Sequence, residues 1–169
     1  MKKKRVVKCK DQLISVIQSE MSKYGKNCDL NHIDISKVRD LSSLFGYSDF
    51  NGDISQWDTS HVFSMEHMFY KSSFNGNITN WDVSNVRYME YMFVESDFKG
   101  DLSNWYPYKL ERICVFDGAI CPIPYWANYE DINERVNAIN RYRLEKGIVK
   151  ELNEELTNNL KIKERKIKV

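Results

Sequence analysis

The chain of 169 residues is 42% hydrophobic, 13% aromatic and 29% charged, has only 7 Gly and 3 Pro, and carries a net charge of +1. This composition is typical of one ordered domain with a packed core, and it excludes disordered and collagen-like chains. A mean hydropathy of -0.57, with no long apolar run, also excludes a membrane-spanning helix.

The first segment, residues 1–28, is basic, with eight Lys or Arg and two Asp or Glu. Its basic start at residues 2–5 is followed at once by further charges, so the apolar region of a secretory signal is absent. No small residue precedes Cys9, which excludes a lipid-attachment motif. We therefore expect a cytoplasmic protein, and its four cysteines, which form no CxxC motif, should be reduced thiols.

A helix is predicted over residues 11–24, before the repeats begin. Asp11 can cap its first turn and Gly25 can end it. One face of this helix is apolar, with Leu13, Ile14, Ile17 and Met21. The helix should cover the first end of the repeats, since an uncovered end would bind other chains.

A repeat of 24 residues organises the middle of the chain. Residues 53–76 and 77–100 match most closely, 29–52 form an earlier copy, and 101–121 form a degenerate copy that serves as a cap. Each copy has a short extended Ile-x-x-Trp stretch, followed by Val-x-x-Met-x-x-Met-Phe with the spacing of a helical face. The glycine that closes each copy, at Gly52, Gly76 and Gly100, predicts a positive φ.

These features predict an α/β repeat solenoid of the leucine-rich-repeat type, built of short strands and helical turns. Since one copy cannot bury its own aromatic side chains, stacking of the copies should create columns of like residues. The predicted columns are Ile33/Trp57/Trp81/Trp105, Leu41/Met65/Met89/Ile113, Leu44/Met68/Met92/Phe116 and Phe50/Phe74/Phe98. An N-terminal capping helix and C-terminal α-helices should flank this solenoid.

Residues 122–169 form a predicted helical extension. The segment 122–126 should pack as a plug before a helix, and Gly147 should interrupt that helix. An apolar stripe follows at every fourth residue, with Ile148, Leu152, Leu156 and Leu160, before a basic end. Three roles remain open for this stripe: docking on the preceding helix, self-association, and contact with a partner or nucleic acid.

The repeated Phe-Asn-Gly-Asp-Ile-Ser-x-Trp-Asp-x-Ser-x-Val-x-x-Met-x-x-Met-Phe, together with the Asp-Leu-Asn-His-Ile-Asp that starts at Asp29, resembles the BspA-like leucine-rich repeat proteins. The resemblance covers about residues 10–126. It implies a binding scaffold for adhesion or interaction in bacteria, with short versions on phages and mobile elements, and it implies no catalytic residue. We expect the chain to differ from secreted members in lacking a signal peptide.

Enzyme signatures are absent from the sequence, which has no Gly-rich phosphate loop, GxSxG or HExxH motif. His61 and His67 correspond to Asn85 and Tyr91 in the next copy, so they are interpreted as variable surface positions rather than metal ligands. The recurring aspartates should accept backbone N–H bonds at turns. We predict no catalytic residue, cofactor or metal.

Positions that the repeat does not fix are the candidates for a partner-binding face, because function resides in sites added to a scaffold. If the Met and Phe positions point inward, several aromatic side chains should gather outside, and exposed aromatic clusters are typical of binding hot spots. The alternative is that some of them lie under the terminal helix. The predicted contact residues are Phe63, His67, Tyr70, Arg87, Tyr88 and Tyr91.

The leading hypothesis is a non-enzymatic protein–protein interaction scaffold of the bacterial or phage cytosol. A second is a phage- or mobile-element-encoded inhibitor of a host-defence nuclease or CRISPR-type immunity complex, acting through the basic tail or through residues 29–104, which hold 12 acidic and five basic residues. A third is nucleic-acid binding through the basic termini. Those termini hold Lys2, Lys3, Lys4, Arg5, Lys161, Lys163, Arg165, Lys166 and Lys168.

Overall fold

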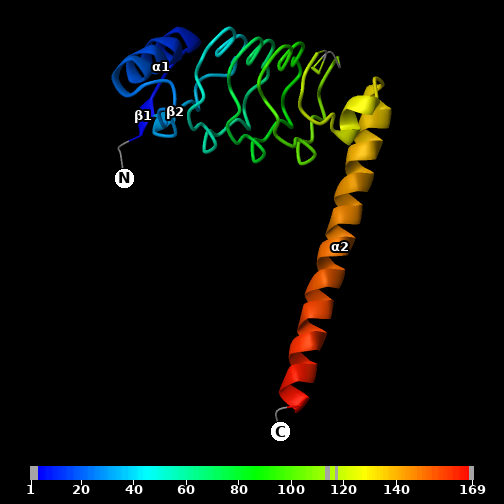
Figure 1. Cartoon of the computed structure of the whole chain (residues 1–169). Coiled ribbons are helices and arrows are strands. Elements are labelled where there is room, and N and C mark those ends of the chain that lie inside the picture. The colour runs from blue at the N-terminus through cyan, green and yellow to red at the C-terminus, as the bar shows by residue number, and fades with distance from the viewer. Residues whose placement is uncertain (1–3, 113–114, 117, 168–169) are drawn as a thin grey trace.

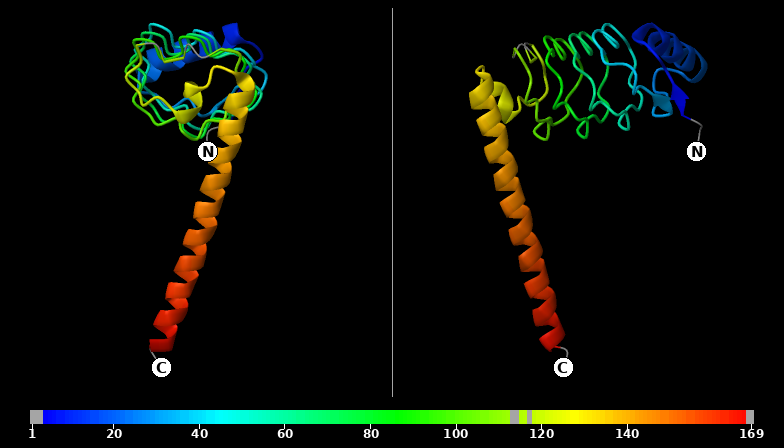
Figure 2. Two further views of the ribbon diagram at one scale, coloured as in Figure 1. Left: turned by 90° about the vertical axis from the view of Figure 1, so that its right-hand side faces the viewer. Right: turned by 180° about the vertical axis from the view of Figure 1, so that it is seen from behind.

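The structure, a computed structural model, describes residues 4–112, 115–116 and 118–167, the last ten of these by their backbone only. In chain order the elements are β1 (Arg5–Val6), α1 (Lys10–Tyr24), β2 (Ile33–Asp34), the 3-10 helix η1 (Tyr125–Asn128) and α2 (Ile132–Ile167). Between α1 and α2 the chain forms a row of irregular coils that lie side by side, and α2 projects away from the end of this row (Figure 1). Seen along the row, the coils share one outline (Figure 2).

The predicted α/β repeat solenoid is wrong, and the leucine-rich-repeat structure is not found. The described residues contain only two strands of two residues each, which pair in parallel in one small sheet with Arg5 opposite Ile33. No α-helix lies within the described part of residues 35–121, where the coils consist of turns and isolated bridges such as Asp40 with Ser64 and Ser64 with Tyr88.

Hydrogen bonding explains why the Val-x-x-Met-x-x-Met stretch is not helical. Tight turns close within the coil, where the N–H of Met68 donates to the carbonyl oxygen of Met65 at 3.2 Å. Alternate N–H groups donate to the next coil instead, as from Met65 to the carbonyl of Tyr88 at 2.8 Å and from His67 to that of Glu90 at 2.9 Å. A turn of this kind spaces inward residues by three, which the sequence pattern alone does not separate from a helical face.

The core runs through the coils as columns of aromatic side chains. Trp57 and Trp81 are buried and stacked with ring centroids 6.4 Å apart, and the indole N–H of Trp81 donates to the carbonyl oxygen of Ile54 at 3.2 Å. Phe74 stacks in the same way on Phe98, at 6.3 Å. The predicted Trp and Phe columns are therefore buried as expected, whereas Ile113 of the second column lies outside the described residues.

The repeated glycines leave room for the phenylalanine ring of their own coil, and at Gly52 and Gly76 also for a backbone oxygen of the preceding segment, rather than serving a positive φ. Among described glycines only Gly25 and Gly118 have positive φ, so the prediction for Gly52, Gly76 and Gly100 is wrong. A Cβ on Gly52 would lie 2.0 Å from the backbone oxygen of the preceding coil and 2.7 Å from a ring carbon of its own coil's phenylalanine. No side chain fits there without moving the backbone.

The first end of the row is covered by α1, which buries Leu13, Val16 and Ile17. Its predicted cap at Asp11 is wrong: the N-cap is Cys9, and no side chain caps the helix.

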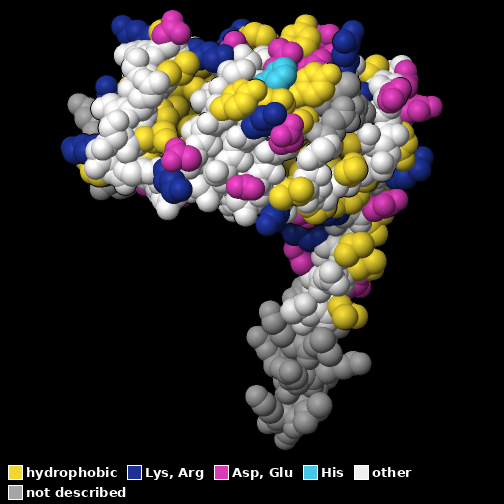
Figure 3. Space-filling model, turned by 45° about the horizontal axis from the view of Figure 1, so that its top comes forward, with side chains coloured by type: hydrophobic (Ala, Val, Ile, Leu, Met, Phe, Trp, Pro, Cys, Tyr) yellow, Lys and Arg dark blue, Asp and Glu magenta, His cyan; other side chains and the backbone are white. Residues whose placement is uncertain are grey.

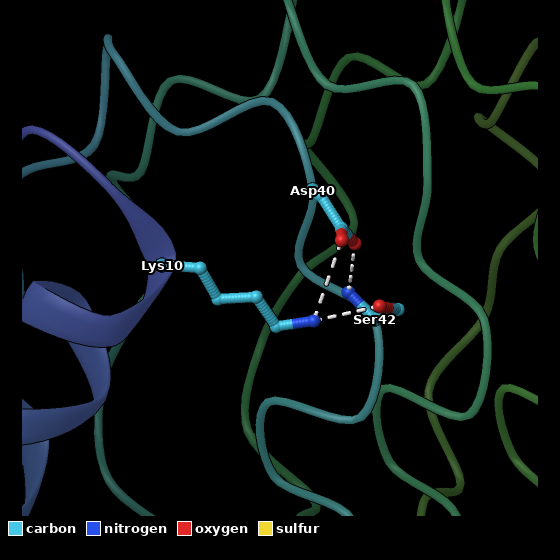
Figure 4. A network of polar contacts seen from close by, with 3 residues as sticks. All are labelled: Lys10, Asp40 and Ser42. Carbon is cyan, nitrogen blue, oxygen red and sulfur yellow. Dashed lines mark hydrogen bonds and ion pairs between the residues drawn. The ribbon is translucent and has the colours of Figure 1, made fainter.

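A lysine of α1 joins the helix to the first coil (Figure 4). The ammonium of Lys10 donates to the Ser42 hydroxyl at 2.6 Å and lies 3.5 Å from the Asp40 carboxylate. Burial raises the pKa of Asp40, but hydrogen bonds from Ser42 and the charge of Lys10 outweigh it, so the net pKa is lowered. The carboxylate therefore stays ionised and holds Lys10 in place.

The other end of the row is closed by η1 and the first turns of α2. Trp126 is buried, and its indole N–H donates to the carbonyl oxygen of Leu102 at 3.3 Å, which extends the Trp column. Phe116 stacks on Phe93 at 6.1 Å, so it joins the phenylalanines and not the predicted methionine column.

Arg135 of α2 fixes this closing cap. Its side chain is fully buried and donates to the backbone oxygens of Leu110, Tyr129 and Glu130. Burial lowers the pKa of the guanidinium, although the group is satisfied by three carbonyl acceptors. The sequence pattern alone does not predict that Arg135 is buried.

Helix α2 continues through Gly147, so the predicted interruption is wrong. The stripe after Gly147 therefore has no preceding separate helix to dock on. Neither α1 nor α2, over the residues described, offers a stretch long and apolar enough to cross a bilayer.

Candidate protein-binding face

Two columns of residues on one side of the coils have left-handed backbone. Ser43, His67 and Tyr91 have φ of 54°, 53° and 56°. Four residues further along each coil, Tyr47, Lys71 and Glu95 have φ of 56°, 50° and 51°. This conformation costs roughly 1–2 kcal/mol for a residue other than glycine. Except for the serine, these positions carry large side chains where glycine would fold more easily.

Aromatic side chains from these columns meet one another and the neighbouring Tyr70 on three successive coils. The rings of His67 and Tyr91 are 5.2 Å apart, and Tyr70 stands edge-on to His67 at 5.5 Å and to Tyr47 at 5.3 Å. Tyr47 is 75% exposed and Tyr91 40% exposed. They surround a shallow pocket of about 470 Å³ lined by Ser43, Gly46, Tyr47, His67, Tyr70 and Tyr91, which we call the tyrosine pocket.

A second aromatic pair lies earlier in the same coils. Phe63, which is 40% exposed, meets the half-buried Tyr88 edge-on at 6.4 Å, and Arg87 beside it is exposed. Figure 3 shows hydrophobic side chains gathered around a histidine on the face of the repeats. Among the described residues, no hydrogen bond, ion pair or ring contact joins the six predicted contact residues to α1 or α2.

The predicted residues therefore divide into the pair of Phe63 with Tyr88 and the tyrosine pocket. Tyr47 was missed, although it is the most exposed aromatic of the face. Its position aligns with Lys71 and Glu95, which form an ion pair at 3.2 Å, and this hydrogen bond and charge raise the pKa of Lys71. Variability at that position was the available signal.

The aspartates and His61 have structural partners. Asp53 accepts the Ser55 N–H at 2.9 Å, and this bond lowers the pKa of the Asp53 carboxyl. His61 Nε2 lies 3.0 Å from the carbonyl oxygen of Ile35. In the described part of the chain, no group of three or more His, Cys, Asp or Glu is placed to hold a metal ion.

The basic termini are only partly described. Lys4 and Arg5 are exposed, and β1 places Arg5 beside the first coil. Lys2, Lys3 and Lys168 lie outside the described residues. The side chains of Lys161, Lys163, Arg165 and Lys166 also lie outside the description, although their backbone is helical.

The sequence matches the family described as "Mycoplasma protein of unknown function, DUF285" over residues 14–118. The match covers more than half of the chain, which therefore belongs to this family. It spans most of α1 and the coils, and ends before η1 and α2. No curated protein and no solved structure matches the chain.

Proposed function

We propose that the protein is a non-enzymatic binding module that holds a protein partner on the tyrosine pocket and the neighbouring pair of Phe63 and Tyr88. The observation that carries this proposal is the set of large side chains at left-handed positions. Backbone strain of this kind persists where a side chain is required for function, since glycine would remove the strain. Exposed tyrosines also supply large contact area at little cost in side-chain entropy.

The family match supports this proposal indirectly. It is compatible with the resemblance to BspA-like proteins, which implies a scaffold for adhesion or interaction in bacteria. The matched region contains the whole candidate face, whereas α2 lies beyond it. Binding by the coils is therefore proposed as the property that this chain shares with its family.

A second proposal concerns the kind of partner. Residues 29–104 hold 12 acidic and five basic residues, and backbone N–H bonds lower the pKa of Asp34, Asp53 and Asp101, which keeps these carboxylates ionised. An ionised acidic surface attracts proteins with basic channels, such as a host-defence nuclease. Direct nucleic-acid binding through the basic termini is the remaining proposal, and a mobility shift at low salt that disappears at high salt would support it.

Replacing Tyr47 and Tyr91 together by glycine tests the binding face. Glycine relieves the left-handed strain, so we expect the free energy of unfolding to stay unchanged or to rise by about 1 kcal/mol. Capture of a partner from a mycoplasma lysate, followed by mass spectrometry, should be lost. A stable variant without binding separates function from folding.

The matched control is Tyr24→Ala, which removes an exposed tyrosine from the end of α1. The same proteins should be retained by the wild type and by this control. Equal capture by the Tyr47/Tyr91 glycine variant would contradict the proposed face.

A further inference from the structure

Helix α2 carries a row of exposed aliphatic side chains. Leu144, Ile148, Leu152 and Leu156 are 66%, 49%, 58% and 63% exposed. They recur at every fourth residue along more than three turns of one helix. Such a continuous row is typical of a helix that packs on another helix.

The row faces away from the protein's own coils. Ile139 is fully buried, Arg143 donates to the Tyr108 hydroxyl at 2.6 Å, and Lys146 donates to the Asn104 side chain at 2.6 Å. These contacts define the side of α2 that faces the coils. Because each residue advances about 100° around a helix, Ile148, nine residues after Ile139, lies on the opposite side. The coils of the same chain cannot cover it.

From residue 147 to residue 157, the described side chains of α2 have no support from the rest of the chain. All described side chains from 147 to 157 are exposed, and no hydrogen bond, ion pair or ring contact joins them to the coils. Figure 2 shows this part of α2 projecting alone. Most helices in proteins depend on packing of an apolar face. A stable interface buries roughly 1,200 Å² or more, so two such helices have to pair along most of their length.

Charges on the outward side select the partner and its direction. Arg141 precedes the apolar row, Glu145 lies beside its start, and Glu151 and Glu155 lie near its end. None of these four side chains forms an ion pair within the described residues. A second helix running in the opposite direction brings Arg141 against Glu155. A parallel helix instead brings like charges together, which is unfavourable.

We propose that α2 pairs with α2 of a second copy of this chain in antiparallel orientation, centred on Ile148. In this arrangement Leu144 of each copy packs on Leu152 of the other, and Arg141 lies opposite Glu155. The two rows of coils then lie at opposite ends of the helix pair. Each keeps its tyrosine pocket open, so the dimer presents two binding faces.

Sedimentation equilibrium of the full chain tests the pairing. The wild type should be a dimer, and Ile148→Asp with Leu152→Asp should be a monomer with unchanged thermal unfolding of the coils. The control is Asn153→Asp with Thr157→Asp, which adds the same charge on the side of α2 opposite the apolar row. This variant should remain a dimer. A monomeric wild type at about 100 µM, well above the dissociation constant of a dimer in the micromolar range, or a dimeric Ile148/Leu152 variant, would overturn the proposal.

Charge reversal tests the orientation. Arg141→Glu and Glu155→Arg should each weaken dimerisation by roughly tenfold, because each change creates two repulsive pairs per dimer. Combining both changes should restore wild-type association, since the pairs are then reversed. If the two effects multiply instead, the helices are not antiparallel in this register. Loss of dimerisation leaves partner capture through the tyrosine pocket to be measured separately.

Discussion

The coils and the outer part of α2 are ordered in opposite ways. In the coils, Phe45 stacks on Phe50 at 4.5 Å and on Phe69 of the next coil at 5.7 Å, and all three rings are buried. In α2, Leu144 and Leu152 are 66% and 58% exposed, and the backbone is ordered by bonds within the helix itself. The irregular backbone of the coils is thus fixed by packing between neighbouring coils. The regular backbone of α2 after Lys146 has no such packing among the described residues.

The largest expected effect breaks the coils at one aromatic column. Trp81→Ala removes a buried ring that stacks on Trp57 and donates to the carbonyl oxygen of Ile54. We expect a loss of about 4 kcal/mol in the free energy of unfolding, since large cavities are costly in a close-packed core. Urea unfolding followed by tryptophan fluorescence measures this loss. A change below about 1 kcal/mol would show that the column is loosely packed.

The same substitution at two glycines compares the regions directly. Gly52→Ala places a methyl group 2.0 Å from a backbone oxygen, so we expect a loss of about 3 kcal/mol. Gly147→Ala meets nothing within 4 Å and should raise helix stability by about 1 kcal/mol. Circular dichroism during urea unfolding measures both. Equal effects at the two positions would contradict the distinction between a close backbone approach and a free helix.

The smallest predicted effect is a loss in the free energy of unfolding of the coils at acidic pH. Hydrogen bonds from Ser55 and Ser103 lower the pKa of Asp53 and Asp101 below the unfolded value of 3.8. Their contribution is present above that value and is lost as the pH falls through the lower folded pKa. Thermal unfolding between pH 5 and about pH 2 should show the loss.

The control for this effect already exists in the sequence. Asn77 holds the position of Asp53 in the next copy and accepts the Thr79 N–H at 3.1 Å without a titratable group. Asp53→Asn should therefore preserve stability at pH 7 and reduce its dependence on pH. An unchanged pH dependence would exclude Asp53 as a contributor.

The sequence was sufficient to predict which residues of the coils are buried but not the backbone that buries them. The 24-residue period identified Trp57 and Phe74 as core residues, because side chains repeat with the coils. The prediction of helical turns in the Val-x-x-Met-x-x-Met stretch was wrong, because tight turns also place every third residue in the core. Gly52 appeared to need a positive φ, whereas the reason for glycine is a contact with another coil, which lies outside local sequence.

The closing cap and the binding face were only partly predictable. Trp126 follows Trp105 by 21 residues rather than 24. The 24-residue period therefore does not align it with the tryptophan column that it extends. Arg135 looks like any charged helix residue until the backbone oxygens around it are known. On the face, variability at one position indicates His67 and Tyr91. Tyr47 is not indicated in this way, because the residues that align with it, Lys71 and Glu95, are charged rather than aromatic.

The hydrogen bonds between coils have a consequence for the gene. Asn75 accepts an N–H from Lys99, and Asn51 accepts one from Asn75 in the same way, each across 24 residues. Asn51 and Asn75 therefore make the same bond to the coil that follows, whereas Lys99 at the corresponding position of the third copy only donates. Recombination that deletes or duplicates one of the two inner copies, 53–76 or 77–100, leaves both caps on the coils that they now contact, while a change of any other length shifts the register of the coils. Natural variants of this chain should accordingly differ in length by entire copies.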